Sequence, residues 1–527
     1  MKLTWTAGSL LLISIVIFFA NSWGFSIYII DEARNAECAR EMLTNGEWIV
    51  PTYNGDLRFD KPPLHYWFMM LGYQLFGVNP FGARFFSGIM GILTVMTTFF
   101  FTKRLLNERV AFFSGLTLLS SLQIALQFHL AVPDPFLIFF VTLGLFSFIS
   151  GLETNHKGHI FLIYIALGFA VLSKGPVAIA LPGLVFLLYL IFTKQLSIPV
   201  LLRLQVPLGS LLFLIIALPW YIMVGLKTDG LWLQEFFFNH NVGRFTSTME
   251  GHGGSFIIIP IIVLAGLLPL SLFLIQGTIK AWKERSTNPL LLFALLVMGV
   301  FVVFFSMSQT KLPTYPEPCY PFVSILIGYY VVYFLQKGKS KTDSIILWSY
   351  TSIMVILPIG LYIGLGQDPV LKDIKHLSVY FSVLSISAII ALSNYYKGYK
   401  TLSIYSMVAG FLLLSQVATY VVLPAMDQQT PVVDGLAKLD TTRTFAYYGR
   451  MNQALPFNLQ KTLPKLETKE ELSNYFAQHP EGYLISEKRN AKSLMEVFPD
   501  LELIYEKIDP FERKTMMVFI VSKDTSL

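Results

Sequence analysis

The sequence predicts an all-helical protein that crosses a membrane many times and ends in a small α/β domain. Of its 527 residues, 54% are apolar and only 14% are charged, whereas soluble domains carry about 25% charged residues. Apolar stretches of the length that a bilayer requires, about 20 residues, recur until about residue 425, where the composition changes. These observations exclude an ordinary cytosolic enzyme, a disordered chain and a nucleic-acid-binding protein.

About thirteen apolar segments are long enough to be membrane spans. The first is expected to be an uncleaved helix, because no small-residue cleavage site precedes Asp31. The segments lie near residues 7–29, 82–102, 110–130, 134–152, 159–173, 176–193, 205–225, 256–277, 288–306, 321–336, 345–365, 376–394 and 401–423.

The loops between these segments predict the orientation of the chain. Lysine and arginine gather in alternate short loops, which marks those loops as cytoplasmic. The opposite, outer face then carries three longer loops, residues 31–80, 226–255 and 307–320, which mix acids, bases, histidines and aromatic residues. An odd number of spans places the C-terminus outside as well, so the outer face is expected to be the working face.

Residues 426–527 have the composition of a soluble α/β domain. Alternating runs predict strands, and Thr468 with Glu471 forms a capping-box pattern that opens a helix. No catalytic constellation is visible in this domain, so it is expected to be dispensable for the chemical step. The predicted strands are Thr444–Tyr448, Tyr483–Ser486, Leu501–Lys507 and Met516–Val521, and a second helix is predicted over Ala491–Val497.

Two acidic motifs lie at the predicted outer boundary of the membrane. Asp31 and Glu32 follow the first span directly, and Asp134 stands between two apolar segments. Carboxylates beside hydrocarbon are costly and usually functional. The alternative is helix capping, since Asp is a good N-cap residue and Glu favours the first helical turn. Residues 36–43, which follow the acidic pair, predict an amphipathic helix in the interface.

The segment Asp60-Lys61-Pro62-Pro63 precedes another predicted amphipathic helix. Proline is tolerated in the first turn of a helix, so Lys61 is expected at a helix N-terminus, where phosphate groups bind readily. The alternative is a lysine whose stem packs on apolar surface while its ammonium reaches the interface.

The run from Asp31 to Trp67 resembles the first outer loop of the GT-C superfamily of glycosyltransferases. Within that superfamily it is most similar to the aminoarabinose (lipid A) transferase and protein O-mannosyltransferase-like family. Five further motifs continue the resemblance in family order, over residues 25–325 in all. They are Leu172–Pro176, Ala217–Tyr221, Asn239–Phe245, Gly266–Pro269 and Ser308–Tyr315.

The resemblance implies a GT-C catalytic domain over residues 1–425. It implies an inverting transfer of a sugar from a polyprenyl-phosphate donor to a lipid A-type or other cell-envelope acceptor, at the outer face of a bacterial-type inner membrane. Asp31 is expected to be the base, with Glu32 and Asp134 as further catalytic residues. The expected partners are the donor, the acceptor and membrane lipids, without nucleic acid, and nothing demands more than a monomer.

Several residues are expected to bind the substrate phosphate at the outer boundary. A buried cation needs a counter-charge, which a phosphate supplies through strong charge-assisted hydrogen bonds. The alternative, for each of these residues taken alone, is that it anchors a lipid headgroup. The expected substrate-binding residues are Lys61, Arg84, Lys174, Arg244, Lys311 and Tyr315, the last from the Ser308–Tyr315 motif.

The chemistry itself needs no cofactor. The resemblance suggests that Asp60 and His240 share a structural divalent ion such as zinc, although no closely spaced histidine motif is present. The alternative is a histidine that only forms hydrogen bonds. Whether Cys38 and Cys319 pair cannot be read from the sequence.

Two other functions stay open. A protein O-mannosyltransferase would use much the same donor site with a Ser or Thr acceptor. A lipid or glycan transporter would need charged residues deep in several spans and inverted repeats. Because the ionisable residues cluster at one face, the sequence favours the enzyme.

Overall fold

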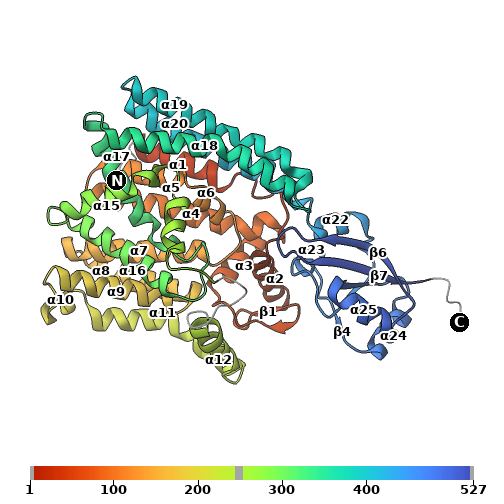
Figure 1. Ribbon diagram of the computed structural model, residues 1–527. Helices are drawn as coiled ribbons and strands as arrows, with labels where there is room; N and C mark the ends of the chain where they lie inside the picture. The colour runs from red at the N-terminus through yellow and green to blue at the C-terminus, as the bar shows by residue number, and fades with distance from the viewer. Residues whose placement is uncertain (1–4, 244–252, 523–527) are drawn as a thin grey trace.

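The computed structural model describes residues 5–243 and 253–522 and shows a helical bundle with a smaller α/β domain at one end (Figure 1). The C-terminal domain, drawn in blue, lies next to α2 (Ile30–Asn45) and α3 (Leu64–Phe76) of the first outer loop. The predicted fold class, a polytopic helical membrane protein with a small C-terminal α/β part, is confirmed.

The described residues contain nine helices that are long and apolar enough to cross a membrane, or ten if one bent pair counts as a span. The bent pair, Ile258–Gly266 (α14) and Leu270–Lys283 (η2 and α15), turns by 119° at its break. The nine are α4 (Pro80–Leu105), α7 (Asp134–Thr154), α8 (Lys157–Lys174), α11 (Val206–Lys227), α16 (Pro289–Met307), η3 with α17 (Glu317–Gln336), α18 (Lys341–Gln367), η4 with α19 (Lys372–Tyr396) and α20 to α21 (Lys400–Asp427).

Three other predicted spans are helical but shorter or interrupted. The helices α1 (Trp5–Phe18) and α9 (Val177–Phe192) have 14 and 16 residues. The predicted span 110–130 is divided into α5 (Glu108–Leu119) and α6 (Leu122–Gln127). The division falls at Ser121, whose hydroxyl caps α6 at Ile124 N, 3.0 Å away, and donates to Gly266 O at 2.5 Å. Hydropathy detects apolar content but not such backbone breaks, so full-length helical spans in the described chain are fewer than the thirteen predicted.

The outer loops carry short elements that position the site. The first loop contains α2, a small hairpin of β1 (Thr52–Tyr53) and β2 (Asp56–Leu57), and α3. Its two predicted helices are therefore present. The second loop contains α12 (Leu231–Gln234) and the π-helical η1 (Glu235–Val242). A further short helix, α10 (Ile198–Arg203), lies outside these loops and precedes α11.

The C-terminal domain is built on a five-stranded sheet of order β4-β3-β5-β7-β6. Strand β3 is parallel to β4 and β5, whereas β7 is antiparallel to β5 and β6. The four predicted strands are present within a residue or two, β4 was missed, and the Thr468–Glu471 capping box is confirmed. The elements are α22 (Pro431–Lys438), β3 (Phe445–Tyr448), α23 (Leu455–Leu459), β4 (Lys465–Leu466), α24 (Lys469–Gln478), β5 (Tyr483–Glu487), α25 (Lys488–Val497), β6 (Leu501–Ile508) and β7 (Thr515–Val521).

One buried apolar cluster joins the C-terminal domain to the first outer loop. It includes Ala36 of α2, Met70 and Tyr73 of α3, and Phe457 of α23. Polar contacts reinforce the join, among them Asn458 Nδ2 to Ile27 O at 2.8 Å. The domain is therefore packed against the loop that carries the predicted site.

The packing of α3 on α4 depends on the absence of a side chain at Gly72. A Cβ atom there would lie 2.1 Å from the carbonyl oxygen of Gly82, so the two helices touch backbone to backbone. This contact joins the second half of α3 to the first turn of α4.

We therefore expect Gly72→Ala to destabilise the protein by about 1–3 kcal/mol, because the added methyl group overpacks the crossing. Gly299→Ala in α16 is the control, since nothing lies within 4 Å of its Cβ position; alanine should stabilise that helix by up to about 1 kcal/mol. Thermal unfolding of both variants in detergent measures the difference. Equal stability of the two would contradict the close crossing.

Candidate active site

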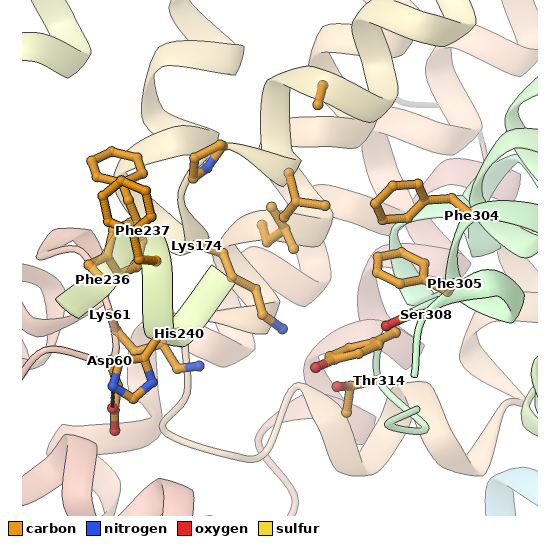
Figure 2. A pocket seen from close by; sticks show the side chains of 16 residues that line it. Asp60, Lys61, Lys174, Phe236, Phe237, His240, Phe304, Phe305, Ser308 and Thr314 are labelled. Atoms are coloured by element: carbon orange, nitrogen blue, oxygen red, sulfur yellow. Dashed lines mark ion pairs between the residues drawn. The ribbon is translucent and has the colours of Figure 1, made fainter. Parts of the chain in front are cut away.

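A cavity of about 500 Å³ lies where α7, α8, α9, η1 and the end of α16 meet (Figure 2). Most of its wall is apolar, formed by Leu137, Pro176, Val177, Ala180, Phe236, Phe237, Phe238, Phe304 and Phe305. Figure 2 shows the Lys174 side chain between a group of Asp60, Lys61 and His240 on one side and Ser308 and Thr314 on the other. The cavity thus suits a ligand with a long apolar part and an anionic end.

Lys61 reaches this cavity from the segment before α3. Pro62 and Pro63 follow it, and α3 begins directly after them. The Lys61 side chain lines the cavity and the residue is only 9% exposed. An ammonium group so far removed from water interacts more strongly with an anion than an exposed one does.

Lys174, Asp134 and Tyr315 come together from three distant segments. Lys174 Nζ donates to Asp134 Oδ1 at 2.5 Å and lies 5.5 Å from the centre of the Tyr315 ring. Lys174 is the last residue of α8, and Gly175 ends the helix with φ +89°. A Cβ at Gly175 would lie 2.5 Å from Phe236, so glycine also lets η1 approach.

Asp60 and His240 also meet, as predicted for a shared site. His240 Nε2 lies 3.1 Å from Asp60 Oδ1, and Arg58 lies 3.3 Å from the other Asp60 oxygen. Burial raises the pKa of Asp60, but the charges of Arg58 and His240 lower it by more than burial raises it. The pKa of Asp60 therefore falls below its usual value. Asp60 is thus held as a carboxylate.

The pair of Asp60 and His240 would supply two ligands to a divalent ion. Within residues 5–243 and 253–522, no group of three or more His, Cys, Asp or Glu residues could hold a metal. A structural zinc site has four ligands, so the described pair does not complete one.

Glu32 and Arg84 occupy places that differ from their predicted roles. They form a buried bidentate ion pair, with Arg84 Nε 2.7 Å and Nη2 2.9 Å from the two Glu32 oxygens. Arg84 also donates to the carbonyl oxygens of Ser22, Phe25 and Ser26. Neither residue lines the cavity. In this arrangement each of the two charges is already neutralised by the other. The predictions that Glu32 is catalytic and that Arg84 contacts the phosphate are therefore corrected.

The Glu32–Arg84 pair instead positions its neighbours. Glu32 Oε1 accepts a hydrogen bond from Ala131 N at 2.9 Å, three residues before Asp134. One carboxylate therefore ties the start of α2, the loop before it and the segment leading to Asp134 to the same point of α4.

Asp31, the neighbour of Glu32, is exposed at the start of α2. It lines a second cavity of about 530 Å³, shared with Arg34 and with residues of the C-terminal domain. Arg58 lies within electrostatic reach of both Asp31 and Asp60. The catalytic role of Asp31 stays a prediction.

Lys311, like Arg84, is not among the described residues that line the first cavity. Lys311 is buried and its Nζ donates to Ser308 O at 2.5 Å. Arg244 lies outside the described residues. The two cysteines, Cys38 and Cys319, are buried and free.

Two charged residues of the site were missed from the sequence. Arg58 is buried beside Asp60 and also donates to Asn35 Oδ1 at 3.1 Å; its place two residues before Asp60 was the available signal. Glu317 is fully buried and accepts from Gln123 Nε2 at 2.8 Å. A single acid in a proline-rich loop gave no signal that distinguishes it from a surface residue.

Comparisons with known proteins agree with this geometry. Residues 60–223 match the family model described as dolichyl-phosphate-mannose-protein mannosyltransferase. The chain is 33% identical to an uncharacterized protein of Aquifex aeolicus over 67% of this chain and 78% of that one. It is 32% identical to the undecaprenyl phosphate-alpha-4-amino-4-deoxy-L-arabinose arabinosyl transferase of Aeromonas salmonicida, over 60% of this chain and 58% of that protein.

The fold is also similar to a solved structure. The crystal structure of ArnT from Cupriavidus metallidurans bound to undecaprenyl phosphate aligns with a TM-score of 0.79 over 97% of both chains, at 23% sequence identity. At that identity the likeness establishes the fold.

The fold, the site and these similarities define an integral-membrane glycosyltransferase. The chain is similar to the aminoarabinose transferases and to the protein O-mannosyltransferase family, and it shares the fold of the solved aminoarabinose transferase. The expected resemblance is therefore confirmed.

The two adjacent acids at the start of α2 should respond differently to neutralisation. Glu32→Gln leaves Arg84 buried without its counter-charge and should cost about 3–5 kcal/mol of stability. Asp31→Asn is the matched control, because a substitution at an exposed position usually changes the free energy of unfolding by no more than about 0.5 kcal/mol. Thermal unfolding in detergent measures both.

A second variant checks the cause. Glu32→Gln combined with Arg84→Met removes both charges and should recover part of the loss. Equal melting of Glu32→Gln and Asp31→Asn would show that the ion pair does not hold this loop.

Proposed function

We propose that the protein transfers a sugar from a polyprenyl-phosphate carrier to an acceptor of the cell envelope, on the outer face of the inner membrane. The observation that carries the proposal is the first cavity, whose aromatic wall ends at Lys61 and Lys174. The names of its relatives, which include undecaprenyl phosphate aminoarabinose transferases, support the same donor class.

The two parts of such a donor match the two parts of the cavity. The polyprenyl chain packs against the phenylalanines of η1 and α16, which removes apolar surface from water. The phosphate lies between Lys61 and Lys174, with the Tyr315 hydroxyl as a further donor. Lys174 shares its charge with Asp134, so the phosphate and Asp134 compete for this lysine.

The reaction is a single displacement with inversion. The acceptor oxygen attacks the anomeric carbon of the sugar and loses its proton to the Asp31 carboxylate. The bond from that carbon to the phosphate oxygen breaks, and polyprenyl phosphate leaves with the electron pair. Lys61 and Lys174 stabilise the charge that develops on the leaving phosphate.

The proposed acceptor is a lipid A-type molecule or another envelope component, and the proposed orientation follows the positive-inside distribution of the loops. The C-terminal domain then lies outside. A reporter fused to the C-terminus that is active only in the cytoplasm would contradict this orientation.

A second candidate is protein O-mannosylation, because the matching family model carries that description. It would use the same donor cavity with a Ser or Thr acceptor. A lipid or glycan transporter is the remaining alternative, and it would form no glycoside.

Product formation by the purified protein in detergent separates these functions. The protein is incubated with labelled undecaprenyl-phosphate sugar and either lipid A or a Ser/Thr-rich peptide. Label on lipid A supports the first function, and label on the peptide supports the second. After reconstitution of the protein into vesicles, movement of the donor across the bilayer without any product would overturn both.

Loss of either cavity lysine should weaken donor binding. Lys61→Ala and Lys174→Ala each remove a partly desolvated phosphate contact worth about 1.5–3 kcal/mol, or roughly tenfold to hundredfold in affinity. Lys227→Ala is the control, since this lysine is exposed and pairs with Glu47 at 2.8 Å outside the cavity. Binding of undecaprenyl phosphate measures the effect, and unchanged affinity in both cavity variants would remove them from the donor site.

Asp31→Asn should lower turnover by roughly 10²–10⁴-fold, the usual contribution of a positioned general base. Stability and donor binding should persist, because Asp31 is exposed in the first turn of α2 and is not its N-cap, and exposed substitutions usually change stability little. Turnover is measured alongside thermal unfolding. An Asn variant of normal yield that keeps near-native turnover would reject Asp31 as the base.

A further inference from the structure

Gln123, at the start of α6, uses its side-chain amide to hold the loop between α16 and η3, residues 308–316, called here the 308–316 loop. Its Nε2 donates to the carbonyl oxygen of Pro313 at 2.8 Å and to Glu317 Oε1 at 2.8 Å. Its Oε1 accepts a hydrogen bond from the Tyr320 hydroxyl at 3.1 Å. Because both N–H donors and the oxygen of the amide are engaged, the orientation of this side chain is determined.

The break between α5 and α6 brings Gln123 to this place. The Ser121 hydroxyl at the break accepts from Ile124 N at 3.0 Å and donates to Gly266 O at 2.5 Å. A Cβ atom at Gly266 would lie 2.0 Å from Gln123 Oε1 and 2.5 Å from the Tyr320 hydroxyl. The absence of a side chain on Gly266 therefore lets the end of α14 approach the amide, and segments far apart in the sequence meet around it.

The carboxyl group of Glu317 depends on Gln123. Glu317 is fully buried, and within residues 5–243 and 253–522 its Oε1 bonds to Gln123 while its Oε2 has no hydrogen-bond partner. A buried polar group that loses its last partner is costly. Removal of the Gln123 amide would therefore displace Glu317 and the end of the 308–316 loop, rather than leave them in place.

The 308–316 loop forms one wall of the first cavity and carries Tyr315. The Tyr315 ring packs on Phe305 with ring centres 5.0 Å apart, and its centre lies 5.5 Å from Lys174 Nζ. Tyr315 is only two residues beyond Pro313, whose carbonyl oxygen Gln123 holds. The place of the Tyr315 hydroxyl in the cavity thus depends on a side chain that is not part of the cavity wall.

We propose that Gln123 is a positioning residue of the donor site, and that it sets the place of the Tyr315 hydroxyl against the donor phosphate. This inference rests on the proposed function, in which Tyr315 donates a hydrogen bond to that phosphate. Gln123 does not line the first cavity, so it acts on the donor only through the 308–316 loop. An amide suits this role because it offers two N–H donors and an acceptor, which neither a carboxylate nor an aliphatic side chain does.

A double-mutant cycle tests this role without depending on turnover. The probe is undecaprenyl phosphate, titrated into the full-length protein in detergent. Gln123→Met keeps the length of the side chain but removes both N–H donors, and it should weaken binding about threefold to tenfold. Tyr315→Phe should have an effect of similar size. The double variant should bind no more weakly than the weaker single variant, because a misplaced hydroxyl and a missing hydroxyl are then equivalent.

The matched control is Gln416→Met in α20. Gln416 is also a half-buried glutamine, but within residues 5–243 and 253–522 its Nε2 has no hydrogen-bond partner, and it does not line the first cavity. This variant should bind the probe as the unmodified protein does. If Gln123→Met folds poorly, Gln123→Glu replaces it in the cycle, because a carboxylate keeps the shape and the acceptor for Tyr320 but lacks both N–H donors.

The outcomes separate this inference from the proposed function. If the losses multiply in the double variant, if the Gln123 variant binds the probe normally, or if Tyr315→Phe does, Gln123 does not act through Tyr315 and the positioning role is overturned. If the cycle shows the expected coupling but no sugar is transferred from the polyprenyl donor, the role of Gln123 stands and the proposed function fails.

Discussion

The buried ion pair of Glu32 and Arg84 is the constraint on which the outer half of the structure depends. A guanidinium inside a helical bundle is tolerable only when its charge and all its donors are matched. Arg84 achieves this with one carboxylate and three carbonyl oxygens of the segment before α2. That segment can therefore adopt one path only, and Asp31 emerges from the membrane boundary at a defined place.

The pair also explains why two identical charges in neighbouring positions have different fates. Glu32 faces inward from α2 and is buried, whereas Asp31 faces outward into a cavity. Successive helix positions are about 100° apart, so a helix that begins at the boundary sends one acid to each environment. On the proposed mechanism, Asp31 acts in the chemical step and Glu32 stabilises the structure.

Charge is distributed between the two cavities in a way that suits a displacement reaction. The first cavity combines Lys61 and Lys174 with an aromatic wall. The second combines the carboxylates of Asp31, Glu487 and Glu512 with the cations of Arg34, Arg450 and Lys514. On the proposed mechanism, the leaving phosphate thus lies beside cations, whereas the attacking group lies where acids and bases are mixed.

The sequence predicted the fold class, the C-terminal strands and most of the charged residues that gather at the site. Asp60, His240, Lys61 and Lys174 line one cavity in the structure, and their motifs are local, with neighbours such as Pro62 and Gly175 that shape the backbone; their roles stay predictions. Prediction from the sequence failed where the outcome depended on tertiary partners. Arg84 and Glu32 lie 52 positions apart, and only their contact distinguishes a buried pair from two ligand groups. The break at Ser121 likewise depends on a contact with a distant segment, at Gly266.

The shared core between the first outer loop and the C-terminal domain has a consequence for synthesis of the protein. Residues of α2 and α3 bury their apolar faces against residues beyond 430, and Ser26 and Asn21 bond to Asp427 and to Thr419 O. The N-terminal loop is synthesised early, while its partners are still untranslated. That loop must wait with exposed apolar side chains, and a chain that stops at any point before the final sheet would leave this surface uncovered.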